Sequence, residues 1–266
     1  MPNENLEEIK EFWEKSSSVE VDERNLRPVA PDEQIQNFLE KNIIKYLQQD
    51  WKCLEIGCGD GFSTVKFAPS VKKILAVDYV EKLIERAGKK ALAENIKNIE
   101  FVHGNALELQ EITKEKFDAL ISIRCLINLA SWENQAKVLE NIANLIKPGG
   151  YVFIAEGWEE GLLGMQELWR KHNLGEFKKA PFNQFIEKKN FLKAIENNFE
   201  VINYHGLGYY LFMSRVLQPA YLFPEKPDHN HKINKVAARM LMENHNLESA
   251  FPECDYAGLY VLKRKS

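Results

Sequence analysis

Residues 51–61, which read WKCLEIGCGDG, decide the fold of this chain. The apolar run at 53–56 predicts a buried strand, and the glycines at 57, 59 and 61 let the backbone turn sharply where a Cβ would collide with a ligand. A helix is predicted to begin at 62–64. This order of strand, glycine turn and helix directs amide N–H groups and the positive end of a helix toward a nucleotide-like ligand.

Two acidic residues narrow the class of ligand. Asp78 ends the next apolar run, about 20 positions further on, where a carboxylate suits the diol of a ribose. Glu55 stands just before the first glycine, where it would repel a pyrophosphate but is compatible with a ligand that carries an ammonium and a sulfonium. S-adenosylmethionine is such a ligand.

Five motifs in order resemble those of the class I S-adenosylmethionine-dependent methyltransferases. The first motif of that family, E/D-x-G-x-G-x-G, stands here as EIGCGDG at 55–61. The resemblance covers residues 51–156 and continues with Asp78, HGNA at 103–106, FDALIS at 117–122 and LIKPGG at 145–150. It implies S-adenosylmethionine as the cofactor and a doubly wound, seven-stranded, mostly parallel sheet, the Rossmann-like methyltransferase fold, with an antiparallel last strand.

Alternating strand and helix patterns independently predict an α/β fold with a parallel sheet. Right-handed crossovers put the carboxyl ends of the parallel strands at one edge of the sheet, where ligands bind. Strands are expected at 51–56, 73–77, 98–102, 117–123 and 150–155, with helices near 62–69, 81–94 and 132–146.

The segments outside this pattern predict a helical cap. We expect an N-terminal helical cap at 1–50, an S-adenosylmethionine-binding core at 51–156, and the rest of the core sheet at 157–266 with acceptor-cap insertions at 157–183 and 206–257. Helices are expected at 161–173 and 183–197. The last two strands, expected at 199–205 and 258–262, are joined by a short turn in the family. Here a long segment separates them, and its apolar spacing predicts a helix at 230–244.

The amphipathic first helix presents two aromatic residues, Phe12 and Trp13. One interpretation is simple packing. The other is a lid that closes on the cofactor or acceptor, with Arg24 or Arg27 available to meet an anionic group.

Composition excludes several classes of protein. A net charge of −4 with 28% charged residues gives no general attraction to nucleic acid. No run approaches the roughly 18 apolar residues of a membrane span. The four cysteines lack C-x-x-C pairing, so neither a disulfide framework nor a zinc site is indicated. We expect a cytoplasmic monomer or homodimer with a small-molecule acceptor and neither a nucleic-acid nor a membrane partner.

The predicted cofactor residues follow the strand ends. The resemblance implies that Glu55 and the glycine turn surround the methionine part, that Asp78 binds the ribose hydroxyls, and that Asn105 and Ala106 meet the adenine. The full set is Glu55, Gly57, Cys58, Gly59, Gly61, Asp78, Tyr79, Asn105, Ala106 and Arg124.

Methyl transfer is an in-line displacement, so the protein must mainly align the reacting atoms and supply a base only for a weakly acidic acceptor. The predicted catalytic residues are Asn128, Glu156, His205 and Tyr209. Asn128 would orient rather than deprotonate. Further candidate bases are His172, His229 and His231; each histidine taken alone is more typical of a surface or core position than of a catalyst. His229 and His231 resemble two metal ligands, but no third His or Cys ligand is signalled and no metal is expected.

The predicted function is transfer of a methyl group to an oxygen or nitrogen of a small molecule. Residues 122–128 lack the N/D-P-P-Y/F/W signature of enzymes that methylate nitrogens of nucleic acids and proteins. Tyr209, Tyr210, Ser214 and Arg215 would suit a sugar, nucleotide-linked or phosphorylated acceptor, unless they form a buried hairpin. Residues 181–183 and 214–215 resemble bacterial methyltransferases of surface-polysaccharide modification. The alternatives are an NAD-dependent oxidoreductase and a non-catalytic S-adenosylmethionine-binding regulatory module.

Overall fold

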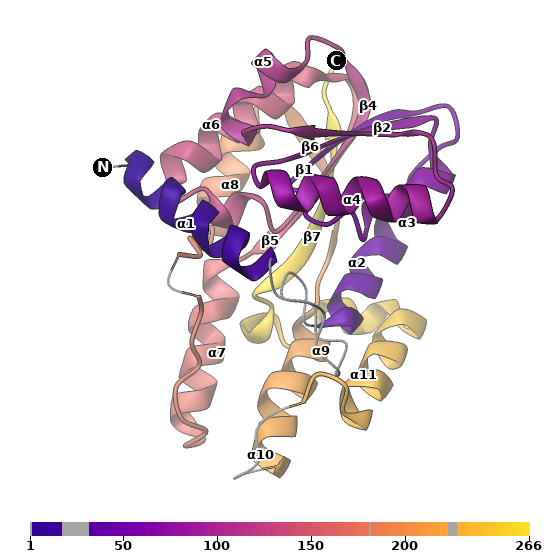
Figure 1. Ribbon diagram of the computed structural model, residues 1–266. Helices are drawn as coiled ribbons and strands as arrows, with labels where there is room; N and C mark the ends of the chain where they lie inside the picture. The colour runs from indigo at the N-terminus through magenta and orange to yellow at the C-terminus, as the bar shows by residue number, and fades with distance from the viewer. Residues whose placement is uncertain (1, 18–31, 181, 223–227) are drawn as a thin grey trace.

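The computed structural model describes residues 2–17, 32–180, 182–222 and 228–266. Seven strands form one sheet in the order β3-β2-β1-β4-β5-β7-β6 (Figure 1). Paired strands run parallel, except that β7 is antiparallel to both β5 and β6. The predicted seven-stranded, doubly wound α/β sheet is confirmed. The strands are β1 (Lys52–Ile56), β2 (Lys73–Asp78), β3 (Ile99–His103), β4 (Phe117–Ile123), β5 (Ile146–Gly157), β6 (Phe199–His205) and β7 (Ala257–Arg264).

The central strands are buried on both faces, as a parallel sheet covered by helices requires. In β1, Cys53 faces one hydrophobic cluster, whereas Leu54 and Ile56 face the other. The first cluster includes residues of α2 (Glu33–Ile44), α7 (Glu159–Lys171), α9 (Gly208–Phe212) and α11 (Lys232–Glu243), and the second includes residues of α6 (Trp132–Leu145) and α8 (Lys188–Ile195). The remaining α-helices are α1 (Pro2–Ser17), α3 (Thr64–Phe67), α4 (Glu81–Ala93), α5 (Leu109–Ile112) and α10 (Gln218–Leu222).

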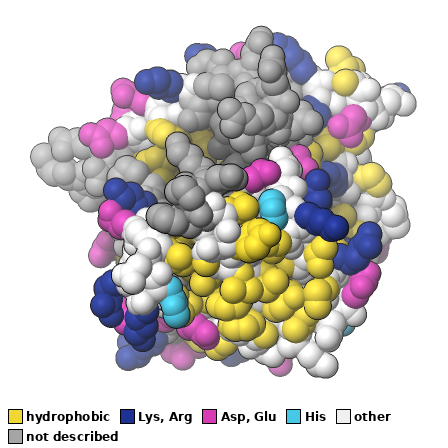
Figure 2. All heavy atoms as spheres, turned by 90° about the horizontal axis from the view of Figure 1, so that it is seen from below, with side chains coloured by type: hydrophobic (Ala, Val, Ile, Leu, Met, Phe, Trp, Pro, Cys, Tyr) yellow, Lys and Arg dark blue, Asp and Glu magenta, His cyan; other side chains and the backbone are white. Residues whose placement is uncertain are grey.

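The segment between β6 and β7 is helical. It contains α9, a π-helical turn at Met213–Leu217, α10 and α11. Tyr209, Tyr210, Ser214 and Arg215 therefore lie on consecutive helical turns, and the alternative of a buried hairpin is wrong. Hydrophobic side chains gather over a broad area of the face seen from below in Figure 2. Among the described residues of this segment, the large hydrophobic side chains that are exposed are Leu217, Tyr221, Val236 and Met240.

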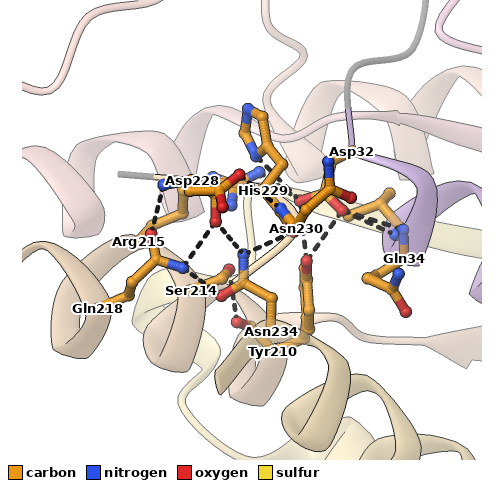
Figure 3. Close-up of polar contacts among 11 residues, drawn as sticks. Asp32, Gln34, Tyr210, Ser214, Arg215, Gln218, Asp228, His229, Asn230 and Asn234 are labelled. Carbon is orange, nitrogen blue, oxygen red and sulfur yellow. Dashed lines mark hydrogen bonds and ion pairs between the residues drawn. The ribbon is translucent and has the colours of Figure 1, made fainter. Parts of the chain in front are cut away.

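A buried carboxylate joins this helical segment to α2 (Figure 3). Asp32 caps α2 by accepting hydrogen bonds from the amides of Gln34 and Ile35 at 3.1 and 3.3 Å. It also accepts a hydrogen bond from the Tyr210 hydroxyl at 2.9 Å and one from Arg215 Nη2 at 2.5 Å. The arginine predicted to suit a phosphate is thus paired with Asp32.

The neighbours of Asp32 stabilise its negative charge. Burial alone would raise the pKa of Asp32, but the neighbouring His229 imidazole and the Arg215 guanidinium hold that pKa well below its usual range. His229 Nδ1 lies 3.7 Å from Asp32 Oδ2. Asp32 therefore remains charged in the folded protein, and its contribution to stability is lost only as the pH falls into the acid range.

Among the helices of the described ranges, none is both long enough and apolar enough to cross a membrane.

Replacing Asp32 with Asn should lower the free energy of unfolding by about 3–5 kcal/mol, because the substitution leaves the Arg215 guanidinium buried without its carboxylate. Urea unfolding monitored by circular dichroism measures the loss. Glu33→Gln, one residue along the chain and exposed, is the matched control and should change stability little. Equal losses of stability in the two variants would contradict the stabilising role of the Asp32–Arg215 pair.

Replacing Gly61 with Ala should destabilise the fold by about 1–3 kcal/mol. Gly61 has a φ of +74°, and a Cβ there would lie 2.8 Å from the Ala87 Cβ in α4. Gly88→Ala is the matched control, because a Cβ at that helical position meets nothing within 4 Å and should stabilise the protein by about 0.5–1 kcal/mol. Urea midpoints that shift in the same direction for both variants would refute the packing role of Gly61.

Candidate active site

A cavity of about 190 Å³ lies at the carboxyl ends of the parallel strands. Its walls come from the glycine turn after β1, the end of β2, the loops after β3 and β4, and helix α1. A smaller hollow of about 50 Å³ adjoins it and shares Gly57, Gly59, Ile123 and Arg124 with it. The predicted residues that line the main cavity are Gly57, Gly59, Asp78, Tyr79, Asn105, Ala106, Arg124 and Asn128. Glu55 and Cys58 line the smaller hollow.

The glycine turn adopts a backbone that other residues rarely accept. Gly57 and Gly59 have φ values of +67° and +56°. A Cβ on Gly57 would lie 2.7 Å from the Cβ of Cys125, so the loop after β4 approaches the turn too closely for any side chain. Gly61, by contrast, borders neither hollow and serves the packing of α4. The turn is thus an open cradle at its first two glycines and a packing contact at its third.

Asp78 holds the turn in place. One carboxylate oxygen accepts a hydrogen bond from the Gly59 amide at 2.8 Å and the other accepts one from the Val80 amide at 2.9 Å. Burial raises the pKa of Asp78 above its ordinary value. The side chain nevertheless borders the cavity, next to Tyr79, whose ring stacks on His103. Each carboxylate oxygen has a further lone pair for a ligand hydroxyl.

Asn105 lies at the same edge and begins a short helical turn. Its side-chain oxygen accepts a hydrogen bond from the Leu107 amide at 3.0 Å. The predicted contact from Asn105 to an adenine amine would have to use the second lone pair of that oxygen. Ala106, the next residue, borders the cavity.

Glu55 is a buried carboxyl group with an unsatisfied atom. The residue is 3% exposed, and its Oε2 accepts no hydrogen bond of normal geometry within the described residues, although the Thr64 hydroxyl lies close enough to lower its pKa. Burial raises its pKa to about 8, and the neighbouring Asp78 carboxylate adds to the rise. An unpaired buried oxygen costs about 1–3 kcal/mol. A cationic ligand in the adjoining hollow would satisfy this oxygen, so Glu55 and the glycine cradle fit the ammonium end of S-adenosylmethionine.

The loop after β4 is fixed by Glu156, from the end of β5. One oxygen of Glu156 accepts hydrogen bonds from the Ser122 hydroxyl and from the amides of Cys125 and Leu126, at 2.9–3.0 Å. The other accepts one from the Ile127 amide at 3.2 Å. Burial raises the pKa of Glu156 to about 7. Its oxygens are therefore directed at the loop backbone, and it does not line the cavity.

The remaining predicted catalytic residues lie in different places. Asn128 borders the cavity, where its amide nitrogen donates to the Arg124 carbonyl at 2.7 Å and its oxygen accepts from Trp13 Nε1 at 3.4 Å. His205 is paired with Glu248 at 2.7 Å, and the Tyr209 hydroxyl contacts the Met240 sulfur at 3.3 Å. Neither His205 nor Tyr209 lines the cavity.

The other histidines also have local roles. His231 caps α11 by accepting a hydrogen bond from the Ile233 amide, His229 lies beside Asp32, and His172 is exposed at the end of α7. Within the part of the chain that the structure describes, no group of three His, Cys, Asp or Glu residues is arranged to hold a metal ion.

Helix α1 covers the cavity, the position predicted by the lid interpretation of its aromatic residues. It contributes Leu6, Ile9, Lys10 and Trp13 to the lining. Arg24 and Arg27, proposed to accompany this lid, lie outside the described residues. Sequence reasoning missed Asn183 as a residue of the cavity lining. No local motif marks Asn183, because its place depends on the pairing of residues 184–186 with the loop after β4 and the end of β5.

Comparison with known proteins identifies the class that this fold and site define. A family model described as "Methyltransferase domain" matches residues 47–200, more than half of the chain. The chain belongs to the family of class I S-adenosylmethionine-dependent methyltransferases.

The relatives are distant. Demethylmenaquinone methyltransferase from Bacillus cereus is 28% identical over 119 residues, which are 44% of this chain and 48% of that protein. The chain thus spans about half the length of the curated relatives it matches. Among solved structures, Haemonchus contortus phosphoethanolamine N-methyltransferase 1, with phosphoethanolamine and S-adenosylhomocysteine, has a TM-score of 0.66 at 14% identity and covers 100% of this chain and 50% of that one. The N-methyltransferase NodS from Bradyrhizobium japonicum, with S-adenosylhomocysteine, has a TM-score of 0.57 at 13% identity and covers 97% and 99%. These structures share the fold.

Replacing Glu55 with Gln should remove a pH dependence of stability in the ligand-free protein. Between the ordinary pKa of 4.5 and the folded value of about 8, the folded protein holds a proton on Glu55 that the unfolded chain has released. Stability therefore falls as the pH rises through this window, by up to about 1.4 kcal/mol per pH unit.

Urea unfolding at pH 5 and pH 8 tests this expectation. The Gln variant should gain stability relative to the wild type on going from pH 5 to pH 8. Glu94→Gln, an exposed position after α4, is the control and should keep the wild-type slope. A Glu55→Gln slope that matches the wild type would show that this carboxyl group is ionised in both states.

Proposed function

We propose that this protein transfers a methyl group from S-adenosylmethionine to an oxygen or nitrogen of a small molecule. The unpaired Glu55 oxygen beside the glycine cradle carries the proposal. A carboxylate at this position attracts the ammonium of an amino-acid ligand and would repel the phosphate of a dinucleotide. The related protein from Bacillus cereus is named for methylation of demethylmenaquinone, and the two solved relatives are named as N-methyltransferases. These names support a small-molecule acceptor.

In this proposal each part of the cavity has a separate task. Glu55 and the amides of the glycine turn would hold the amino-acid end of the cofactor, and Asp78 would accept hydrogen bonds from its ribose. Asn105 and Ala106 would flank the adenine. When bound, S-adenosylmethionine supplies a methyl carbon activated by the sulfonium.

The acceptor side of the cavity is assigned to α1 and the loop after β4. Trp13 and Ile9 of α1 cover the cavity and exclude water, while Asn128 holds Trp13 through its side-chain oxygen. Asn128, bonded at both ends of its amide, orients its neighbours. Alignment and exclusion of water are the main contributions that such a displacement needs from the protein. A sugar, nucleotide-linked or phosphorylated metabolite remains a candidate acceptor.

Replacing Asp78 with Asn should weaken binding of S-adenosylmethionine and S-adenosylhomocysteine by about tenfold to a hundredfold, because a charge-assisted hydrogen bond to the ribose is lost. Calorimetric titration measures both affinities, with NAD as a third ligand that should give no heat. Glu81→Gln, exposed at the first turn of α4, is the control and should bind as the wild type does. Binding of NAD, or silence from both adenosyl ligands in the wild-type protein, would refute the proposed function.

A further inference from the structure

The cavity has an end formed by Asn128, Asn183 and Trp13, which we call the acceptor end. Building on the proposed function, we propose that this end binds the amino group of a primary or secondary amine, and that Asn183 accepts a hydrogen bond from its N–H. The methyl acceptor would then be a nitrogen.

The first observation is an unsatisfied oxygen. Asn183 Oδ1 is buried and has no hydrogen-bond partner within the described residues, although the residue lines the cavity. A buried carbonyl-type oxygen without a donor costs about 1–3 kcal/mol. Since an amide oxygen can only accept, the group that satisfies it is an N–H or O–H donor, and a ligand in the cavity can supply one.

The second observation is that the backbone around Asn183 is firmly held. The Asn183 amide donates to the Ala180 carbonyl at 3.0 Å, and the Gln184 amide donates to the Ile127 carbonyl at 2.8 Å. Gln135 Nε2 also donates to the Gln184 carbonyl at 2.7 Å. These bonds attach the segment to the loop after β4 and to α6, so the backbone that carries the Asn183 side chain is held in place before a ligand arrives.

The third observation is a cluster of three aromatic rings, Phe12, Trp13 and Phe182, of which Trp13 lines the cavity together with Asn183. The rings of Trp13 and Phe182 lie 6.1 Å apart, and the Phe12 ring lies 4.4 Å from that of Phe182. Asn128 holds the Trp13 ring through the hydrogen bond to its Nε1. Aromatic faces attract the partly positive hydrogens of an amine and the full charge of an ammonium. An oxygen acceptor in a cavity that is also lined by an indole ring is thus suited to a nitrogen group.

The nucleophilicity of the bound group favours an amine over a hydroxyl as the methyl acceptor at this site. A neutral amine can donate one N–H to Asn183 and still present its lone pair to the methyl carbon. A hydroxyl bonded to Asn183 would have to lose that proton to become a strong nucleophile, and an amide oxygen is too weak a base to take it. In the amine reaction the nitrogen lone pair forms the N–C bond, the electron pair of the broken C–S bond stays on sulfur, and the methylated ammonium then loses its proton to water.

The test compares matched amines and alcohols as ligands of the protein loaded with S-adenosylhomocysteine. The pairs are ethanolamine with ethylene glycol and benzylamine with benzyl alcohol, titrated by calorimetry at a pH above the pKa of each amine. The same four compounds are then offered with S-adenosylmethionine, and the release of S-adenosylhomocysteine is measured. The proteins are the wild type, Asn183→Leu, Asn183→Asp and the control Asn190→Leu, which makes the same change on α8 outside the cavity lining.

We expect at least one amine to bind the loaded wild type and to be methylated, with its partner alcohol at least tenfold weaker. Asn183→Leu should bind that amine at least tenfold more weakly while keeping wild-type affinity for S-adenosylhomocysteine, and Asn183→Asp should restore binding because it keeps an oxygen acceptor. Asn190→Leu should behave as the wild type.

Three results would overturn the inference while leaving the proposed function standing: methylation of an alcohol in preference to its amine, unchanged amine binding in Asn183→Leu, or no binding of either amine although S-adenosylhomocysteine binds. Failure of S-adenosylhomocysteine to bind the wild-type protein would refute the proposed function itself, and this titration is performed first.

Discussion

Hydrogen bonds from loop amides to buried carboxylates at strand ends are the constraint on which the site depends. Asp78, at the end of β2, holds the glycine turn after β1 through the Gly59 amide. Glu156, at the end of β5, holds the loop after β4 through three consecutive amides. In both cases a carboxylate from one strand positions the loop of its neighbour. Such charge-assisted bonds can stabilise the positive φ angle of Arg124, at +54°, which a residue with a Cβ would seldom adopt in an isolated loop.

Glu55 is the exception among these carboxyl groups, and the difference lies in its partners. Burial raises the pKa of both Glu55 and Glu156, to about 8 and about 7. Both oxygens of Glu156 are occupied by the loop, whereas one oxygen of Glu55 has no partner among the described residues. Two similar acidic groups, on strands separated by β4, thus differ in their partners: the oxygens of Glu156 are bonded to the loop, whereas one oxygen of Glu55 is left open to a ligand in our proposal.

Sequence reasoning predicted the sheet and the cavity residues at the strand ends because both depend on local patterns. The strands follow apolar runs, and the residues at their carboxyl ends meet whenever the strands are parallel. The roles of Glu156 and Arg215 could not be predicted in the same way. Each is a charged residue in a plausible position, but its partner, the 125–127 backbone or Asp32, is distant in sequence and carries no periodic signal. Asn183 was missed for the same reason.

The place of β7 has a consequence for the order in which the molecule assembles. This strand fills the position between β5 and β6, and roughly 50 residues separate it from β6, so closing that loop costs about 3 kcal/mol more than a two-residue turn would. Until β7 docks, β5 presents an unpaired edge, and such edges template aggregation. In the folded protein α11 packs on α2 and the Tyr210 hydroxyl is bonded to Asp32, so formation of these contacts would shorten the open loop that β7 has to close.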